Sequence, residues 1–163
     1  MKSISDYIRG RSETIHIPTF KSKKDITVFF SKYLRSVSDN ETSVNLFSKV
    51  KDRNCYITFD RETGFSDYLI ININDSNQSP RGLRMRPNKS LRDDQKLFFK
   101  LVSNEMDSIL MSNRDKEKLV SDFKSFLDVD IKLPIDTENE MIGIINNCIS
   151  AFYRLGADWK LIR

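Results

Sequence analysis

The chain has 163 residues, of which 39% are hydrophobic and 31% charged, and its formal net charge is +4. This length predicts one domain, residues 1–163, that can bury a core. The content of eleven Phe, five Gly and four Pro excludes a disordered chain and argues against a turn-rich all-β barrel. No run of about eighteen apolar residues occurs, and Cys55 and Cys148 form no CxxC motif. We therefore expect a cytoplasmic protein with reduced thiols and no membrane contact.

The first predicted elements are a helix, an extended segment and a second helix. Residues 3–9 favour a short helix, and residues 13–20 alternate enough to predict a strand or an extended arm. Apolar side chains then recur at helical spacing over residues 26–37, and Ser22 and Asp25 are placed to cap that helix. This stretch predicts an amphipathic helix.

The strongest strand pattern lies within residues 54–74. β-Branched and aromatic residues fill positions 56–59 and 68–73, and the connection 60–64 ends in a glycine that tolerates positive φ. This pattern predicts a β-hairpin. The preceding residues, 42–50, fit neither the helical nor the strand period well, and we expect a short helix there.

Three helices are predicted to follow. The first spans residues 90 to about 111 and begins with a capping box, the second spans 114–127, and the third spans 137–155 and also begins with a capping box. Together with the helix at 26–37, these segments predict an α+β fold. We expect a small antiparallel sheet built on the 54–74 hairpin and packed against about four amphipathic helices.

The charge is divided unevenly along the chain. Residues 1–92 hold 17 basic and 10 acidic residues, whereas residues 93–163 hold 10 basic and 13 acidic ones. The domain thus has a basic half that bears the hairpin and an acidic helical half. Such an asymmetry indicates an acidic partner, either nucleic acid or a protein surface, although a normally solvated surface explains so small an excess equally well.

One segment, residues 76–91, contains basic side chains and no acidic one. Pro80, Pro87 and Gly82 oppose helix and strand there, so we predict an exposed basic loop. Arginine guanidinium groups bind carboxylates or phosphates. The apolar residues between the arginines slightly favour a groove on a partner protein over the phosphate backbone of a nucleic acid. The candidate binding residues of this basic loop are Arg81, Leu83, Arg84, Met85, Arg86 and Lys89.

A secondary basic surface is predicted from Arg9, Arg11, Lys21, Lys23 and Lys24. We predict a non-enzymatic accessory or regulatory protein that binds a larger partner protein through the basic loop. The alternative is a nucleic-acid-binding protein that uses the same surface. A third explanation is that the loop arginines pair internally with Asp93 and Asp94. The composition, rich in Ser, Asn, Asp and Lys, is compatible with a viral or phage accessory protein.

Catalytic and metal-binding patterns are weak. The single histidine, His16, is distant in sequence from Cys55 and Cys148, and neither cysteine has an activating context. One His and two scattered Cys do not supply a zinc site, and residues 128–132 (Asp-Val-Asp-Ile-Lys) supply only one fragment of a restriction-type nuclease core. Neither GxxxxGK[ST] nor GxGxxG occurs. We therefore expect no enzyme activity, no metal and no small-molecule cofactor.

The order of elements over residues 14–74 resembles the first half of an RNA-recognition motif. An extended segment (14–20), a helix, and an Asp-x-x-Thr-Gly connection (60–64) between two strands follow the order of that family. The resemblance implies stacking of RNA bases on strand aromatics. Asp67, however, stands where the family has an aromatic residue, and residues 41–53 are an insertion. We therefore do not assign the chain to that family.

Overall fold

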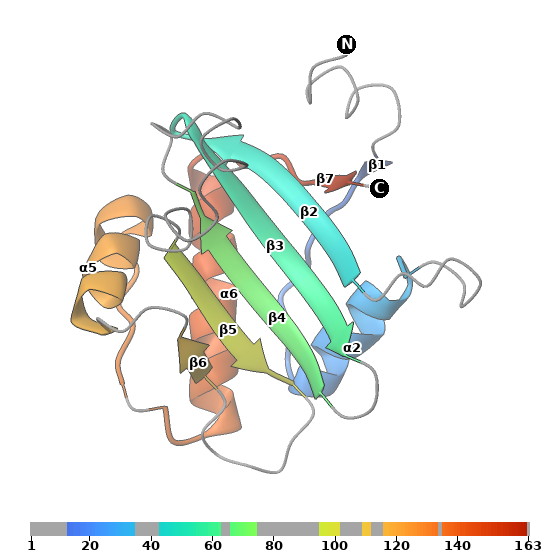
Figure 1. Cartoon of the computed structure of the whole chain (residues 1–163), viewed down its shortest axis with the longest axis horizontal. Helices are drawn as coiled ribbons and strands as arrows, with labels where there is room; N and C mark the ends of the chain where they lie inside the picture. The colour runs from blue at the N-terminus through green and yellow to red at the C-terminus, as the bar shows by residue number, and fades with distance from the viewer. Residues whose placement is uncertain are drawn as a thin grey trace, which may run out of the picture.

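The computed structural model describes residues 13–34, 43–62, 66–74, 95–101, 109–111, 116–133 and 135–162. These residues form an α+β fold with one antiparallel sheet (Figure 1). The strands are β1 (Glu13–Thr14), β2 (Ser43–Val50), β3 (Arg53–Glu62), β4 (Ser66–Ile73), β5 (Gln95–Lys100), β6 (Ile109–Met111) and β7 (Lys160–Ile162), and the helices are α2 (Lys23–Ser31), α5 (Lys116–Leu127) and α6 (Glu138–Arg154).

The sheet has seven strands in the order β1-β7-β2-β3-β4-β5-β6. Strands β2 to β6 follow one another as a meander, and every pairing is antiparallel. Strand β7 lies between β1 and β2, so segments from both ends of the described chain share one edge of the sheet (Figure 1). Strands β3 and β4, which cover the predicted hairpin, pair from Cys55–Ile73 to Glu62–Ser66.

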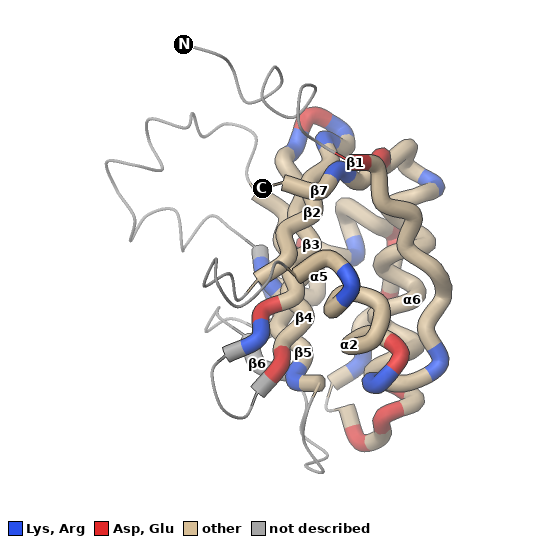
Figure 2. The backbone as a smooth tube through the Cα atoms, turned by 90° about the vertical axis from the view of Figure 1, so that its right-hand side faces the viewer, with Lys and Arg blue, Asp and Glu red and all other residues tan. Residues whose placement is uncertain are grey.

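Helices α2 and α6 pack on one face of this sheet, and the edge-on view in Figure 2 shows both helices on the same side of the strands. Side chains that point to this face are fully buried in the central strands, whereas their neighbours in sequence are half-buried, as the two-residue period of a strand requires. Phe30 of α2 stacks on Phe59 of β3 with 5.7 Å between ring centroids. The largest fully buried side chains are Trp159, Phe30, Phe59, Phe99, Phe123, Phe152, Ile26, Leu46, Ile57, Leu69, Ile71 and Ile73.

Two predicted helix caps are confirmed. The Ser22 hydroxyl accepts a hydrogen bond from the Asp25 backbone N–H at 3.1 Å. At the start of α6, the Thr137 hydroxyl accepts from the Glu140 N–H at 3.1 Å, and the Glu140 carboxylate accepts from the Asp136 N–H at 3.1 Å. These bonds satisfy backbone donors that have no partner inside a helix, which is why the sequence marks these starts clearly.

The extended segment before α2 is held mainly by side chains of α6. The Ile17 N–H donates to the Tyr153 hydroxyl at 2.8 Å, and the Asn146 amide makes two hydrogen bonds with the Phe20 backbone, at 2.9 and 2.8 Å. Only Glu13 and Thr14 form a strand. The prediction of an extended arm is therefore confirmed over the described residues.

The number of helices was predicted incorrectly. Three helices are described, and the helix expected over residues 90–111 is replaced within the described residues by strands β5 and β6. Leu97 and Phe99 are fully buried on the helix-covered face, while Phe98 between them is half-buried on the other face. The adjacent apolar residues 97–99 are compatible with the period of a helix and with that of a strand. The segment forms a strand because it pairs with β4.

The short helix expected over residues 42–50 is also wrong, because this segment is strand β2. Two residues of β2 do not follow the alternation of apolar and polar side chains that is typical of a strand. Ser48 occupies a buried position, where its hydroxyl accepts a hydrogen bond from the Asp158 N–H at 2.8 Å, and Phe47 lies on the opposite, half-buried face. The polar residue is inside and the aromatic one is outside, so the alternation does not show in the sequence.

The resemblance to the RNA-recognition motif does not extend to the sheet. In the segment 14–20, only Thr14 belongs to the sheet, and the residues after it lie along α6. The supposed insertion, residues 41–53, contains strand β2, which pairs with β3. Asp67 lies buried on the helix-covered face, so it does not replace an aromatic residue on an open sheet surface. The family's mode of stacking bases therefore has no counterpart at this position.

Candidate partner-binding site

All six candidate residues of the basic loop lie outside the described residues, as do Arg9, Arg11, Asp93 and Asp94. The structure does describe where the chain leaves and re-enters this region. Asn74, after β4, donates its backbone N–H to the Asn54 carbonyl at 3.0 Å, and β5 begins at Gln95. The basic loop is therefore connected to the sheet at the end where β2 turns into β3, at the top of Figure 1.

The described part of the predicted secondary surface lies elsewhere. Lys21 and Lys24 are exposed, but Lys23 is only 9% exposed and has a polar interaction within the protein. Lys23 and Lys24 begin α2, and Lys21 lies just before it. The far end of this helix contacts the opposite end of β3 through Ser31 and Arg61. The structure therefore does not bring these lysines together with the end of the sheet that bears the basic loop.

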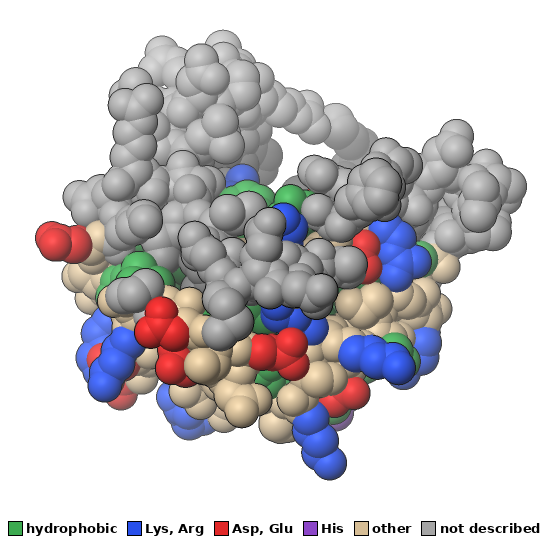
Figure 3. Space-filling model, turned by 90° about the horizontal axis from the view of Figure 1, so that it is seen from below, with side chains coloured by type: hydrophobic (Ala, Val, Ile, Leu, Met, Phe, Trp, Pro, Cys, Tyr) green, Lys and Arg blue, Asp and Glu red, His purple; other side chains and the backbone are tan. Residues whose placement is uncertain are grey.

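Charges on the described surface near that opposite end are mixed. In the view from below, Figure 3 shows basic and acidic side chains interspersed over the described part of the face, and no area of a single sign dominates there. A surface of this kind is typical of ordinary solvation. At the turn between β2 and β3, by contrast, two basic residues, Lys51 and Arg53, contact the same aromatic ring of α5.

This turn consists of Lys51 and Asp52, between the paired residues Val50 and Arg53. Both turn residues have positive φ, 50° and 64°, as a type I′ turn requires. Asn and Gly are favoured in such turns because other side chains are strained there, yet the chain has Lys and Asp. The turn places one basic side chain at its first position and another directly after it.

The turn is attached to the carboxyl end of α5. The Lys51 ammonium donates to the Phe126 carbonyl at 3.0 Å. Carbonyls in the last turn of a helix lack partners within the helix and carry partial negative charge, so a cation is favourable there. This bond fixes the position of the Lys51 charge.

Arg53 and Lys51 share one aromatic ring. The Arg53 guanidinium carbon lies 5.1 Å from the Phe126 ring centroid, and the Lys51 Nζ lies 5.2 Å from it. Both distances are within the range of cation–π attraction. With Asp122 and Ser125 of α5, these residues line a pocket of about 300 Å³. We name it the α5 pocket, and it consists of Lys51, Arg53, Asp122, Ser125 and Phe126.

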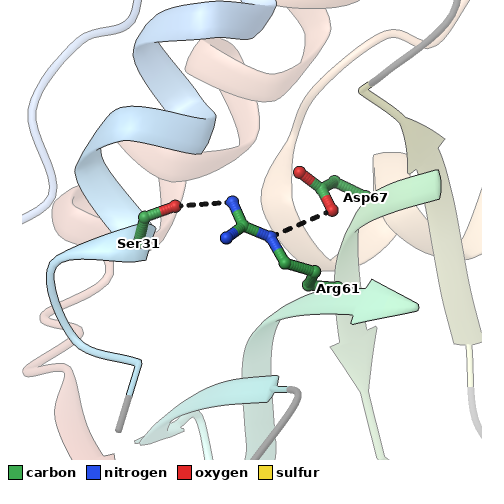
Figure 4. A network of polar contacts seen from close by, with 3 residues as sticks. All are labelled: Ser31, Arg61 and Asp67. Atoms are coloured by element: carbon green, nitrogen blue, oxygen red, sulfur yellow. Dashed lines mark hydrogen bonds and ion pairs between the residues drawn. The ribbon is translucent and has the colours of Figure 1, made fainter. Parts of the chain in front are cut away.

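Arg53 differs from the other arginine of β3 in how its donors are used. Arg61 donates from Nη2 to the Ser31 hydroxyl at 2.9 Å, and its Nε lies 3.4 Å from an oxygen of Asp67, which is buried (Figure 4). The Arg53 side chain, by contrast, has no hydrogen bond or ion pair with any described residue. Within the described part of the chain, its guanidinium N–H groups have no acceptor.

Residues on the other side of α5 are paired with one another. Lys124 Nζ lies 3.2 Å from a carboxylate oxygen of Asp128 and 3.2 Å from one of Asp130, and the hydrogen bond to Asp128 is the main cause that raises the pKa of Lys124. The acidic fragment at 128–132 thus pairs with a cation. Among the described residues, no group of three His, Cys, Asp or Glu side chains is arranged to hold a metal ion.

The two cysteines are core residues. Burial raises the pKa of Cys55 to about 12, with the Arg53 charge offsetting only part of the effect, and burial raises the pKa of Cys148 to about 12 as well. Such thiols stay protonated near neutral pH and are poor nucleophiles. His16 is exposed and packs its ring 5.5 Å from that of Tyr153.

Sequence reasoning missed the α5 pocket. The signal that could have revealed it is the two-residue spacing between β2 and β3, which predicts a tight turn at Lys51 and Asp52 once both flanking segments are recognised as strands. The contribution of Phe126 has no local signal, because Lys51 and Phe126 are 75 positions apart in the sequence.

Comparisons with known proteins add no assignment. No protein-family model matches the sequence, and searches of curated proteins and of solved structures found no match. None of the helices in the described residues is long and apolar enough to cross a lipid bilayer.

Proposed function

We propose that this protein is a non-enzymatic accessory or regulatory protein that binds an acidic surface of a larger partner protein. The contact surface consists of the basic loop and the basic residues at the end of the sheet from which that loop departs, Lys51 and Arg53. The observation that carries the proposal is the Arg53 guanidinium, which lies on an aromatic ring at this end of the sheet and has no acceptor among the described residues.

Preorganisation supports a binding role for these two cations. Lys51 is fixed by its bond to the Phe126 carbonyl, and Arg53 lies against the same ring. A partner that meets cations already held in place loses less side-chain entropy on binding than one that meets free surface lysines. Lys49, exposed on β2 close to the same turn, adds a further positive charge. Electrostatic attraction of this kind increases the rate of association with an acidic surface.

A second candidate function is nucleic-acid binding, and the sheet face opposite the helices favours it. Phe47 and Tyr56 lie side by side on this face with 5.3 Å between ring centroids, and Lys49 lies on the same face. Proteins that bind single strands combine aromatic stacking surfaces with basic grooves. Both rings are half-buried and pack against each other at 51°, which limits stacking with bases, so a protein partner remains the leading proposal.

The experiment compares partner capture and nucleic-acid binding in the same variants. Changing Arg81, Arg84 and Arg86 together to Ser is expected to abolish capture of a specific protein by the immobilised chain. A matched control changes Lys21, Lys24 and Lys32 of the α2 region to Ser, which removes the same charge at the other end of the sheet. Loss of capture in both variants would indicate a non-specific charge effect.

Nucleic acid is tested by mobility shift at low salt. We expect no shift of generic single- or double-stranded DNA or RNA by the wild-type protein. A shift with a steep salt dependence that the Arg81, Arg84 and Arg86 variant loses would replace the protein partner by nucleic acid, because each neutralised phosphate makes affinity more sensitive to salt. If neither capture nor shift is seen, the proposed binding function is wrong.

A further inference from the structure

We infer that the α5 pocket binds the side-chain carboxylate of a Glu or Asp residue of the partner protein. This inference rests on the proposed function and adds the chemical group that is recognised. It is made from Lys51, Arg53, Asp122, Ser125 and Phe126, all of them described, and from the open space of about 300 Å³ that they line.

The Arg53 guanidinium is suited to a carboxylate. Its central carbon lies 5.1 Å from the Phe126 ring centroid, and the side chain donates no hydrogen bond to a described residue. The guanidinium has five N–H donors in a rigid planar fork. Two adjacent donors in this plane match the spacing of the two oxygens of a carboxylate.

Lys51 and Ser125 supply further donors. One N–H of the Lys51 ammonium is used by the Phe126 carbonyl, and the ammonium has further N–H groups that this bond does not occupy. Ser125, whose side chain carries a hydroxyl, also lines the pocket. A carboxylate bound to Arg53 would therefore lie close to a second cation and a neutral donor.

The backbone of the turn agrees with a binding role. Lys51 and Asp52 both adopt positive φ, which is unfavourable for residues with a β-carbon by roughly 1–2 kcal/mol each. Of these two residues, Lys51 lines the pocket. Strained backbone is concentrated at functional sites because the geometry it imposes is needed there.

Asp122 favours a carboxylate over a phosphate. Its own negative charge lines the pocket, so a doubly charged phosphate would be repelled more strongly than a singly charged carboxylate. A phosphodiester is singly charged, but it is flanked by sugars on both sides and does not end inside a concave pocket. The side chain of Glu ends in its carboxylate, and its methylene groups can contact the Phe126 ring. The pocket thus fits a protein partner better than a nucleic acid.

The test measures binding of a short polyglutamate peptide to the full chain by NMR, with the Arg53 Nε–H signal as the local readout. We expect this signal to shift on addition of the peptide and not on addition of a polyglutamine peptide of equal length. Arg53→Gln is expected to weaken binding by about tenfold, as loss of a charged hydrogen-bonding group does. Arg53→Lys keeps the charge but lacks the planar fork, and it is expected to weaken binding as well.

Controls separate the pocket from general electrostatics and from misfolding. Lys132→Gln removes one exposed positive charge outside the pocket and is expected to bind as the wild type does. Ser125→Ala leaves the ring contacts of Phe126 intact and is expected to weaken binding by a smaller factor. Circular dichroism and thermal unfolding of each variant confirm that a loss of binding is not a loss of fold.

The inference is overturned if the wild type does not bind polyglutamate, or if Arg53→Gln and Arg53→Lys bind it as the wild type does. It is also overturned if single-stranded DNA displaces the peptide and depends on Arg53 more strongly than the peptide does. The two failures are distinguishable. Loss of partner capture in the variant of Arg81, Arg84 and Arg86, together with normal capture by Arg53→Gln, would retain the proposed function and reject the pocket, whereas no capture by the wild type would reject the proposed function.

Discussion

The two ends of strand β3 each bear an arginine on the helix-covered side of the sheet, and these arginines are used differently. Arg61 lies over Phe59 and forms polar contacts with Ser31 and Asp67, so it links α2 to the sheet (Figure 4). Arg53 lies over the ring of Phe126 but forms no such contact with any described residue. One arginine is part of the fold, and we propose that the other binds an external acceptor. Residue type and strand position alone do not distinguish these roles.

The largest effect on stability is expected from replacing Phe59, the aromatic residue that Arg61 contacts. Phe59 is fully buried and stacks on Phe30, so Phe59→Ala should lower the free energy of unfolding by about 3–5 kcal/mol. Phe98→Ala removes the same side chain from a half-buried position on the opposite face and should have a clearly smaller effect. Chemical denaturation measures both. Equal losses would contradict the division of the sheet into a core face and a partly open face.

Cys55, between the two arginines of β3, leads to a prediction about alkaline pH. Burial raises the pKa of Cys55 and of Cys148 from 9.0 to about 12, so below pH 9 both thiols are protonated in the folded and in the unfolded protein. Above pH 9 only the unfolded chain loses these protons, and stability should fall with rising pH until the folded thiols ionise near pH 12. The two thiols together should lower the free energy of unfolding by about 3 kcal/mol at pH 10.

Denaturation curves between pH 8 and pH 10 measure this loss. The variant in which Cys55 and Cys148 are both changed to Ala should lose less stability over the same interval. A thiol reagent at neutral pH should modify neither cysteine in the folded protein and both after unfolding. Rapid modification of the folded protein would show that burial does not protect the thiols.

Removing Arg61 should have a moderate effect. Arg61→Ala leaves the carboxylate of Asp67 buried without its cation, which should lower the free energy of unfolding by about 1–2 kcal/mol, reduced from the value for a fully buried pair because Arg61 is partly exposed. Adding Asp67→Asn should restore part of the loss. The double-mutant cycle, measured by thermal unfolding, would refute a structural role for the pair if the two effects were simply additive.

The smallest effect on stability is expected at the other end of the strand. Arg53→Ala removes one cation–π contact and no hydrogen bond to a described residue, so the free energy of unfolding should change by less than about 1 kcal/mol. Binding of polyglutamate should nevertheless weaken by about tenfold or more. A loss of stability as large as that of Arg61→Ala would show that Arg53 belongs to the fold, and the contrast between the two ends would disappear.

The sequence predicts those parts of the structure that are set by local chemistry. The capped start of α6, the helical period of α5 and the extended segment along α6 are all visible as short-range patterns, because a cap or a period involves neighbours in the sequence. The α+β class and the antiparallel sheet are likewise confirmed. The basic loop stays a prediction, since its residues lie outside the described part of the chain.

Long-range packing explains what could not be predicted. Strand β5 has adjacent apolar residues that suit a helix as well as a strand, and pairing with β4 determines the result. In β2, Ser48 is accepted in the core because the Asp158 backbone supplies its partner across the fold. The α5 pocket combines a turn and a helix that are distant in the sequence, so neither segment alone carries a recognisable motif.

The position of β7 has a consequence for how the protein is made. Residues 160–162 pair with β2 on one side and with β1 on the other, so this part of the sheet cannot close on the ribosome until they have emerged. During synthesis, the backbone of β2 presents an open edge, and open edges recruit strands from other chains. We therefore expect nascent chains that stop before Trp159 to depend on chaperones more than chains that include β7 do.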